Sequence, residues 1–348
     1  MNIINKKNIE VKENKELSSK FLTAANGELN FDCKILKEDF FLDSHNYFPI
    51  TANYNTFDEL FSWGDNLKYK KFDTKIFFED FKKNEISFKT FSNIFVLGSS
   101  SVDNYYRNMI TFFPRIFFAN EKKIKLGIHR NLSNKFKNFI LSVCQKLNIE
   151  VQWIFLDDGF YKFIDSQIPE FLSKNYSIKI LNNLINLKKN QATKENDEKI
   201  YITRYNTIYR NLINETDVAD LLKKNGFKLF NLNNLDIFQQ IELFSKAKVI
   251  VGVTGSGLTN TAFCRPGTKV IEIMPNYQYS YENHLKLRYQ YISNELNLDY
   301  IKVEADPVEL EIDIKNNKVS NFISSNVLNE SNYYKNLLIK IDKLKQIL

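Results

Sequence analysis

The residues of this sequence with the clearest chemical pattern lie in a glycine-rich turn. Four of the ten glycines fall within residues 252–267, in the segment VIVGVTGSGLTNTAFCRPG. An apolar run of strand type leads into Gly255-Ser256-Gly257, and a helix is predicted over residues 257–265. Its first turn contains Leu258, Thr259 and Asn260. Glycine lets the backbone approach a ligand closely, and helix N-termini bind phosphate through free N–H groups, so the segment predicts a phosphate-binding turn.

The same residues allow other interpretations of this turn. A tight strand–helix turn without a ligand is the alternative that glycine spacing alone leaves open. The dinucleotide site of a Rossmann-type NAD(P)-dependent oxidoreductase is disfavoured, because the pattern G-x-G-x-x-N lacks the third glycine and follows a late strand of its domain. A serine hydrolase is excluded, because Ser256 does not lie in G-x-S-x-G.

Charged side chains accompany the turn. Arg204 and Arg210, two of seven arginines, lie just after the predicted strand KIYITR. They are expected at the carboxyl edge of the sheet, where open α/β sheets bind ligands, and guanidinium groups suit bidentate phosphate contacts. Surface salt bridging is the alternative for the arginines. Glu272, a lone acid in the strand KVIEIM, is a candidate partner for ribose hydroxyls, as in dinucleotide folds.

Two segments of the N-terminal half also carry polar groups after predicted strands. In LGSSSVDNYYR, the start of a predicted helix groups Asp103, Asn104, Tyr105 and Arg107. In LDDGFY, two carboxylates, including Asp158, follow a strand. Such acids are candidate general bases, and turn formers or helix caps are the alternative.

The elements that must position these residues alternate between strand and helix. In the C-terminal half we predict strands over 199–204, 228–232, 249–253, 269–274 and 300–303, with helices over 214–225, 236–248, 257–265 and 283–295. In the N-terminal half we predict strands over 93–98, 123–129 and 150–156, with helices from about 103 and over 132–147. This alternation predicts an α/β fold with parallel sheets that are covered on both faces.

The polar stretch 182–199 predicts the boundary between two domains. We expect an N-terminal, acceptor-side α/β domain over residues 1–190, with an extra N-terminal layer, and a C-terminal Rossmann-like domain over residues 191–330. The tail 331–348 is predicted to form a helix that packs back on the N-terminal domain.

Composition narrows the classes of function. The 348 residues are 43% hydrophobic, enough for a sizeable core. The net charge of +7 is spread along the chain, which favours a solvated lysine-rich surface, with attraction to an acidic membrane or an anionic substrate as the alternative. No basic stripe with interleaved aromatic residues predicts nucleic-acid binding.

Cysteine and histidine usage disfavours metal and disulfide chemistry. These residues are isolated along the sequence: Cys33, Cys144, Cys264, His45, His129 and His284. They predict neither a disulfide framework nor a transition-metal site. No apolar run approaches the ~18 residues of a membrane span, and the polar start has no secretory signal pattern.

Taken in order, the three best segments resemble glycosyltransferase family 61. The family's "isR…R.l.NE" pattern is matched by Arg204, Arg210, Asn214 and Glu215. Its helix with "Q…lf..A" is matched by Gln240, Leu243, Phe244 and Ala247. Its "vvG.hGAGltN..F..pGt.viEi.P" pattern is matched by Gly252, Gly255, Gly257, Leu258, Thr259, Asn260, Phe263, Pro266, Gly267, Glu272 and Pro275. Upstream, Asn104-Tyr105-Tyr106 is similar to "N-Y-[YF]-H", and Phe113-Pro114-Arg115 to "l-P-R".

The resemblance implies a GT-B architecture, in which two Rossmann-like domains face a cleft. It implies sugar transfer from a nucleotide-sugar donor to a glycan or lipid-linked glycan acceptor, with inversion and without a metal or other cofactor. The donor is then expected at the turn, with Arg204 and Arg210 adding charge to bind its pyrophosphate and Glu272 holding the ribose. The expected donor-binding residues of the turn are Thr254, Gly255, Ser256, Gly257, Leu258, Thr259 and Asn260. Among general bases, Asp158 is favoured over Asp103, because a strand-end acid can face the cleft. Asn104, Tyr105 and Arg107 are expected on the acceptor side.

Three departures separate this sequence from the family pattern. Arg107 and Thr254 stand where the family has histidines, and Gly-Ala-Gly is Gly-Ser-Gly. A different donor, a shifted catalytic group or lost activity each explain them, so a non-catalytic nucleotide- or glycan-binding relative is the alternative function. The leading hypothesis is a cytoplasmic enzyme of bacterial capsule or lipopolysaccharide synthesis, with peripheral association at the inner membrane as an option.

Overall fold

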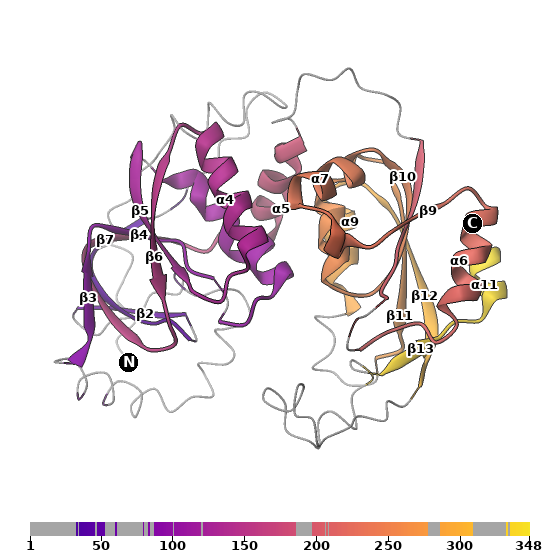
Figure 1. Ribbon diagram of the computed structural model, residues 1–348, viewed down its shortest axis with the longest axis horizontal. Helices are drawn as coiled ribbons and strands as arrows, with labels where there is room; N and C mark the ends of the chain where they lie inside the picture. Colours follow the sequence, from indigo (N-terminus) through magenta and orange to yellow (C-terminus); the bar gives the residue numbers. More distant parts are fainter. Residues whose placement is uncertain are drawn as a thin grey trace. The chain divides into compact units, whose positions relative to one another are not determined.

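The structure, a computed structural model, divides the chain into two compact units, Met1–Asn186 and Leu187–Leu348 (Figure 1). It describes residues 33–52 except 34 and 46; 60, 79 and 83; 87–119 except 100; 121–185; 197–277 except 206 and 208; 286–308; and 332–348 except 333 and 334. The boundary between the units lies in the polar stretch 182–199. Most of the expected N-terminal layer falls outside the described residues.

The first unit is built on one sheet of the order β2-β1-β7-β4-β5-β6, with β3 beside β7. Its strands are β1 (Ile35–Asp43), β2 (Phe48–Thr51), β3 (Lys89–Ser92), β4 (Ile94–Val96), β5 (Lys123–His129), β6 (Glu150–Leu156) and β7 (Phe160–Pro169). The strands β4, β5 and β6 are parallel, as the alternation predicts. Because β1 runs antiparallel to β7, its end at Asp43 pairs with Phe160, directly after the turn that follows β6.

Two α-helices of the first unit are α4 (Asn134–Lys146) and α5 (Lys174–Asn183). The Ser133 side chain caps α4 by accepting a hydrogen bond from the Phe136 N–H. Apolar residues at helical spacing, Phe136, Phe139, Ile140 and Val143, are buried. The helix predicted over 132–147 and the strands β5 and β6 are therefore confirmed.

The helix predicted from about residue 103 has an unusual form. It contains a π-helix, η4 (Arg107–Phe112), followed by a 3₁₀-helix, η5 (Phe113–Phe118). The Asn104 side chain accepts a hydrogen bond from the Arg107 N–H at 3.0 Å, in the manner of a helix cap. Wide π-turns often occur at functional sites.

The sheet of the second unit has the order β13-β12-β11-β10-β8-β9. Its strands are β8 (Glu198–Ile202), β9 (Lys228–Phe230), β10 (Ala247–Val253), β11 (Lys269–Pro275), β12 (Asp299–Val308) and β13 (Asn336–Leu338). All are parallel except β13, which pairs antiparallel with β12. The strands predicted in this half are confirmed, with ends that differ by a few residues.

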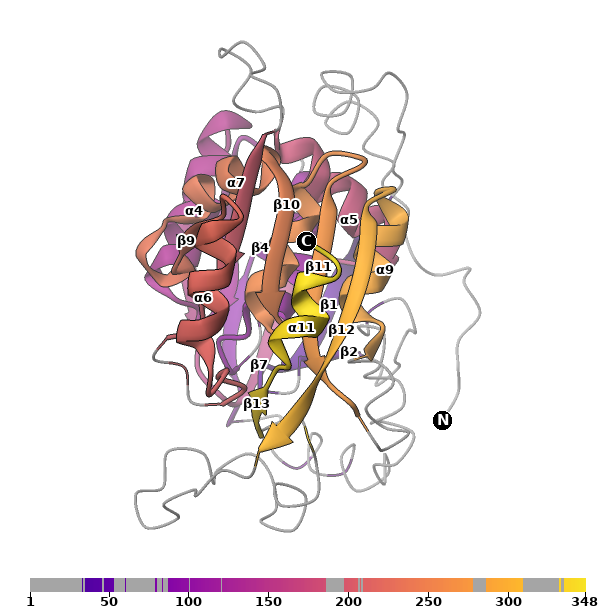
Figure 2. The ribbon, with the colours of Figure 1, turned by 90° about the vertical axis from the view of Figure 1, so that its right-hand side faces the viewer.

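Helices cover both faces of this sheet (Figures 1 and 2). One face packs against α6 (Glu215–Lys224) and α11 (Ile341–Lys345), through a core that includes Val218, Leu222 and Leu344. The other carries α7 (Ile237–Ser245), η8 (Ser256–Phe263) and α9 (Arg288–Glu295), and the short η7 (Leu232–Asn234) precedes α7. Coverage of both faces explains the continuous apolar run of β10. The beginning of the helix predicted over 283–295 lies outside the described residues.

The segment after the glycine turn differs from the prediction. Residues 257–265 were expected to be α-helical, whereas Ser256–Phe263 form a 3₁₀-helix. The Leu258 N–H donates to the Gly255 carbonyl at 2.9 Å, and the Thr261 hydroxyl bonds back to the Leu258 carbonyl at 2.8 Å. One glycine and two threonines favour an α-helix weakly, and Pro266 prevents its extension.

The C-terminal tail packs in its own unit, so the prediction of a helix on the N-terminal domain needs correction. Residues 336–338 form β13 against β12, and only Ile341–Lys345 are helical. Leu337, Ile339 and Leu344 are buried in the core of the second unit. The tail therefore adds a strand beside β12 and covers apolar residues of the second unit. No helix in the described part of the chain is long and apolar enough to cross a membrane.

Candidate functional site

The second sheet has a topological switch point between β8 and β10. The chain passes from β8 to β9 on one side of β8, whereas β10 and β11 follow on the other side. Ligands of open α/β folds bind in the crevice that such a reversal opens at the carboxyl ends of the strands. Arg204 follows β8, and Gly255 follows β10. We use the term switch-point site for Arg204, Arg210, residues 254–260 and Glu272.

The guanidinium of Arg204 lies directly on the backbone of the glycine turn. A Cβ atom on Gly255 would approach Arg204 Nη1 to 2.1 Å, so only glycine leaves room for this arrangement. Arg204 Nη2 donates to the Tyr209 carbonyl at 2.9 Å. The buried Glu215 carboxylate accepts hydrogen bonds from the Arg204 N–H at 3.0 Å and from the Tyr201 hydroxyl at 2.9 Å. The structure therefore holds the Arg204 guanidinium against the backbone of Gly255 at the switch point.

Residues of the turn differ in their exposure. Ser256 is exposed and Gly257 is half-buried. The remaining predicted contact residues are buried: Thr254, Leu258, Thr259 and Asn260. A ligand at this turn would thus contact mainly backbone and the exposed hydroxyl of Ser256.

Asn260 anchors the turn to the neighbouring helix. Its Nδ2 donates to Gln240 Oε1 at 2.8 Å and to the Gly257 carbonyl at 3.1 Å. Gln240 Nε2 in turn donates to the carbonyls of Leu232 and Leu235. Asn260 is completely buried, so its described contacts make it a structural link between η8 and α7.

Glu272 is completely buried within the second unit. Its Oε2 accepts a hydrogen bond from the Tyr300 hydroxyl at 2.6 Å. Burial raises the pKa of the Glu272 carboxyl to about 7, against the opposing effects of Thr254, Tyr300, Arg210 and Arg288. Arg210 is itself buried, in a left-handed conformation with φ of 60°. A ribose contact with Glu272 would require the residues that cover it to move.

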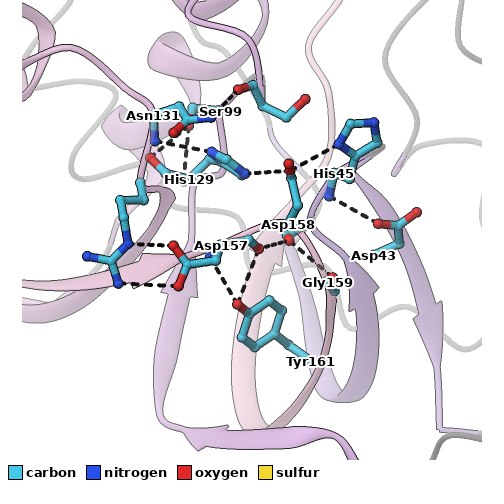
Figure 3. A network of polar contacts seen from close by, with 12 residues as sticks. Asp43, His45, Ser99, His129, Asn131, Asp157, Asp158, Gly159 and Tyr161 are labelled. Carbon is cyan, nitrogen blue, oxygen red and sulfur yellow. Dashed lines mark hydrogen bonds and ion pairs between the residues drawn. The ribbon is translucent and has the colours of Figure 1, made fainter. Parts of the chain in front are cut away.

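The first unit gathers three side chains that we name the histidine–aspartate cluster: His45, His129 and Asp158. His129 ends β5, whereas His45 and Asp158 follow the ends of β1 and β6. Asp158 Oδ1 lies 2.9 Å from His129 Nε2 and 3.0 Å from His45 Nδ1 (Figure 3). His129 is almost completely buried, whereas the side chains of His45 and Asp158 are 49% and 54% exposed.

Hydrogen bonds define the state of the buried histidine. The Asn131 N–H donates to His129 Nδ1 at 3.2 Å, so this nitrogen acts as an acceptor. His129 is then neutral, with its proton on Nε2 and donated to Asp158. The Ser99 hydroxyl accepts from the His129 N–H at 3.0 Å and fixes the main chain at the end of β5.

A second set of contacts holds the turn that carries the carboxylate. The Ser44 hydroxyl donates to the carbonyls of Asp157 and Gly159, and the Asp157 N–H donates to the Tyr161 hydroxyl at 2.9 Å. The Asp157 carboxylate accepts hydrogen bonds from Arg130. This frame fixes the loop after β1 against the turn after β6.

Charges and hydrogen bonds keep both carboxylates ionised. The hydrogen bond from Arg130 lowers the pKa of Asp157. Partial desolvation raises the pKa of Asp158, but the hydrogen bonds from the His45 and His129 rings outweigh it and leave that pKa below its ordinary value. Asp158 is therefore a carboxylate at neutral pH.

Comparison with known proteins identifies the family of this chain. Residues 105–271 match the family model described as Glycosyltransferase 61. This match identifies residues 105–271 as a glycosyltransferase family 61 region. A search of curated proteins gave no match. The match indicates glycosyltransferase activity, for which the partners are in general a nucleotide sugar and a glycan acceptor.

The region that matches glycosyltransferase family 61 spans parts of both units. It contains Asp158, Arg204, Arg210 and the glycine turn, whereas His45 and Glu272 lie outside it. Each unit of this glycosyltransferase therefore contributes one of the two clusters described above.

The "l-P-R" segment of the family has a structural position here. Arg115 is fully buried, and its guanidinium donates to the carbonyls of Leu97 and Pro169 and to the Tyr47 hydroxyl. Its Cζ also lies 4.2 Å from the centroid of the Phe171 ring. Arg115 thus links the ends of β4 and β7.

The "N-Y-Y" segment lies apart from the histidine–aspartate cluster in its described contacts. Asp103 Oδ1 accepts from Asn108 Nδ2 at 3.0 Å, and Asn104 caps the following helix. Tyr105 packs edge-on against Phe136, and Arg107 lies 5.8 Å from the centroid of the Phe112 ring. These contacts give Asp103 and Asn104 the character of helix-start residues, the alternative that the sequence left open.

Sequence reasoning missed two residues of the cluster. His45 and His129 were interpreted as isolated, yet the structure brings both to Asp158. His129 ends β5, so its place at a strand end was a usable signal. For His45 the signal was absent, because β1 had not been predicted. No group of three histidine, cysteine or acidic side chains within the described residues has the arrangement of a metal site.

Proposed function

We propose that this glycosyltransferase transfers a sugar from a nucleotide-sugar donor to a glycan or lipid-linked glycan acceptor, with inversion and without a metal ion. We propose the GT-B type that the family resemblance implies, with the donor bound by the second unit. The observation that carries the proposal is the Arg204 guanidinium held against Gly255 at the switch point. Donor diphosphate is the ligand class that fits a cation beside bare backbone N–H groups.

The charge of the site supports departure of a nucleotide without a metal. When the glycosidic bond to phosphate breaks, negative charge develops on the leaving oxygen, and fixed donors or cations must stabilise it. Arg204 supplies a guanidinium, and the N–H groups at the start of η8 supply partial positive charge. The buried Arg210 adds positive charge within the same site.

The histidine–aspartate cluster supports the chemical half of the proposal. An inverting transfer needs a general base to accept the proton of the acceptor hydroxyl. Asp158 is half exposed and ionised, so we propose that its cluster supplies this function in the first unit. We further propose a role in bacterial capsule or lipopolysaccharide synthesis at the cytoplasmic side, with peripheral attachment to the inner membrane, whose acidic lipids attract a net charge of +7.

A donor panel tests the proposed function. The full chain is heated with UDP-, GDP- and CMP-sugars and with the free nucleotides, and its melting temperature is compared with that of the unliganded protein. Ligand that binds the native state raises the melting temperature. We expect one nucleotide class to stabilise the wild type, and Arg204→Ala to abolish that shift.

A matched arginine serves as the control for this experiment. Arg265 lies just after η8, outside the switch-point site, so Arg265→Ala should keep the wild-type shift. If neither nucleotide sugars nor nucleotides stabilise the wild type, the proposal is wrong. Donor binding with neither hydrolysis nor transfer would favour a non-catalytic relative.

A further inference from the structure

The histidine–aspartate cluster contains three groups that could accept a proton, and their contacts distinguish them. His129 is 3% exposed, with Nδ1 accepting from the Asn131 N–H and Nε2 donating to Asp158. Neither of its ring nitrogens is open to a substrate. His129 therefore holds the carboxylate in place and takes no proton from an acceptor.

Asp158 is the second group, and its environment makes it a weak base. Its Oδ1 accepts hydrogen bonds from two imidazole rings, at 2.9 and 3.0 Å. Such bonds stabilise the carboxylate and lower its affinity for a proton. Two donors therefore already occupy Asp158 Oδ1.

His45 is the third group, and its ring has one nitrogen to spare. Because Asp158 is a carboxylate, the contact at 3.0 Å requires the proton of a neutral His45 to lie on Nδ1. The lone pair is then on Nε2, across the ring from Asp158 (Figure 3). The side chain is 49% exposed, so this nitrogen is accessible to a hydroxyl group.

Hydrogen bonds also hold the main chain around His45. Its N–H donates to Asp43 Oδ1 at 3.0 Å, and the preceding Ser44 is bonded to the turn that carries Asp158. Three of the charged or titratable groups described near the cluster have partners of their own. Asp157 binds Arg130, and the Tyr161 hydroxyl contacts the backbone of Asp157.

We propose that His45 is the general base of the glycosyl transfer and that Asp158 and His129 are positioning residues. This inference rests on the proposed function. In the step, the acceptor O–H loses its proton to His45 Nε2 while its oxygen forms a bond to the anomeric carbon. The bond from that carbon to the donor phosphate oxygen breaks, and its electron pair leaves with the nucleotide. The Asp158 carboxylate stabilises the imidazolium that forms, which then releases its proton to water.

The first test compares variants of the full chain in hydrolysis of the nucleotide sugar that gives the largest thermal shift, with nucleotide release as the readout. His45→Ala should lower kcat at least 100-fold, because a general base contributes about 10²–10⁴-fold. KM for the donor should change less than about twofold. Added imidazole should restore part of the rate of His45→Ala, which a purely structural role would not allow.

The roles within the cluster are separated by a second set of variants. Asp158→Asn should lower kcat at least tenfold, and His45→Ala combined with Asp158→Asn should be no slower than His45→Ala alone, because the two act as one unit. Asp165→Asn is the matched control, since Asp165 is an exposed acid of β7 outside the cluster. If His45→Ala retains kcat while Asp158→Asn loses it, the assignment to His45 is overturned.

Nuclear magnetic resonance tests the proposal without any turnover. Long-range ¹H–¹⁵N spectra at pH 8 report the tautomer of each histidine, and His45→Gln and His129→Gln variants assign the signals. We expect a proton on Nδ1 of His45 and on Nε2 of His129. A proton on Nε2 of His45 would leave no lone pair for an acceptor and would overturn the inference. Failure of the proposed function is recognised separately, as absence of a thermal shift with every donor.

Discussion

The switch-point site and the histidine–aspartate cluster are built in opposite ways. The first uses a continuous glycine turn, whose neighbours Glu272 and Asn260 are completely buried. The second uses side chains from separate strand ends, and its frame includes a hydrogen bond between residues 113 positions apart. A contiguous turn leaves a pattern in the sequence, whereas a cluster assembled by topology leaves none.

This difference in construction predicts a difference in energetics. Substitutions in the buried switch-point site should change the free energy of unfolding, because they leave polar groups or charges without solvent. Substitutions in the half-exposed cluster should change the reaction while stability stays nearly constant. The following variants test that contrast, from the largest expected change to the smallest.

Glu272→Gln should have the largest effect, and it should depend on pH. Since the native pKa of Glu272 is raised to about 7, the native state retains this proton to a higher pH than the unfolded chain. The free energy of unfolding of the wild type therefore falls as pH rises from about 4.5 through about 7. Glu272→Gln removes this contribution, which is on the order of 3 kcal/mol at pH 8.

Urea denaturation of both proteins at pH 5 and pH 8 measures the effect. Other carboxyl groups contribute equally to the two proteins, so the difference between them isolates Glu272. Equal pH dependence in wild type and variant would mean that the buried carboxyl has an ordinary pKa in the native state.

Asn260→Ala should lower the free energy of unfolding by about 2 kcal/mol, because it removes two buried hydrogen bonds. Gln240→Ala should not add its full effect in the double variant, since both residues share one bond. Ser256→Ala, on the exposed part of the same turn, is the control and should stay within about 0.5 kcal/mol. A neutral Asn260→Ala would refute the anchor between η8 and α7.

Gly255→Ala should separate binding from stability. The added Cβ displaces the Arg204 guanidinium, the end of a flexible side chain, so the free energy of unfolding should change by less than about 1 kcal/mol. Donor affinity should fall about tenfold, which corresponds to about 1.4 kcal/mol. Calorimetric titration with the stabilising nucleotide sugar measures it.

Gly267→Ala should lower stability and leave donor affinity unchanged, the opposite of Gly255→Ala. Gly267 has φ of 81° with nothing near the position of a Cβ, so alanine there should cost about 1 kcal/mol of stability and no affinity. Unchanged affinity in Gly255→Ala would remove Arg204 from the proposed donor site.

Asp158→Asn should have the smallest effect on stability. The low pKa of Asp158 contributes stability above its ordinary pKa, and this contribution is lost as pH falls through the native value. Because the side chain is 54% exposed, solvent screens the contribution to below about 0.5 kcal/mol at pH 7. A loss above about 1.5 kcal/mol in urea denaturation would show that the cluster is a structural element.

The sequence predicted those features that depend on residues close together along the chain. The strands β5, β8, β10 and β11 were predictable, because burial on both faces or regular alternation is written in adjacent residues. The placement of Arg204 beside the glycine turn followed from strand order and the edge rule for parallel sheets. The 3₁₀ form of η8 was missed, since propensity and local back-bonding compete over only eight residues.

Long-range features escaped prediction for a physical reason. The Gln240–Asn260 bond and the contacts of His45 depend on side chains from elements that the sequence does not show as neighbours. The burial of Glu272 was missed similarly, because a lone acid in an apolar strand gives no sign of what covers it. The sequence patterns therefore predicted most of the strands and helices, but not the side-chain contacts that their packing produces.

The position of β13 near the end of the chain affects how the protein folds during translation. The Asn214 side chain binds the main chain of Ile339, and Leu212 pairs with Leu337, over 125 residues of intervening chain. Closing so long a loop is entropically costly, and it must wait until these residues have been synthesised. In the first unit β1 pairs with β7 over a similar separation, but this unit ends at residue 186, so its residues are complete early and it is free to fold while translation continues. A ribosome stalled before residue 336 should therefore carry a protease-resistant first unit and a second unit that is still open to cleavage.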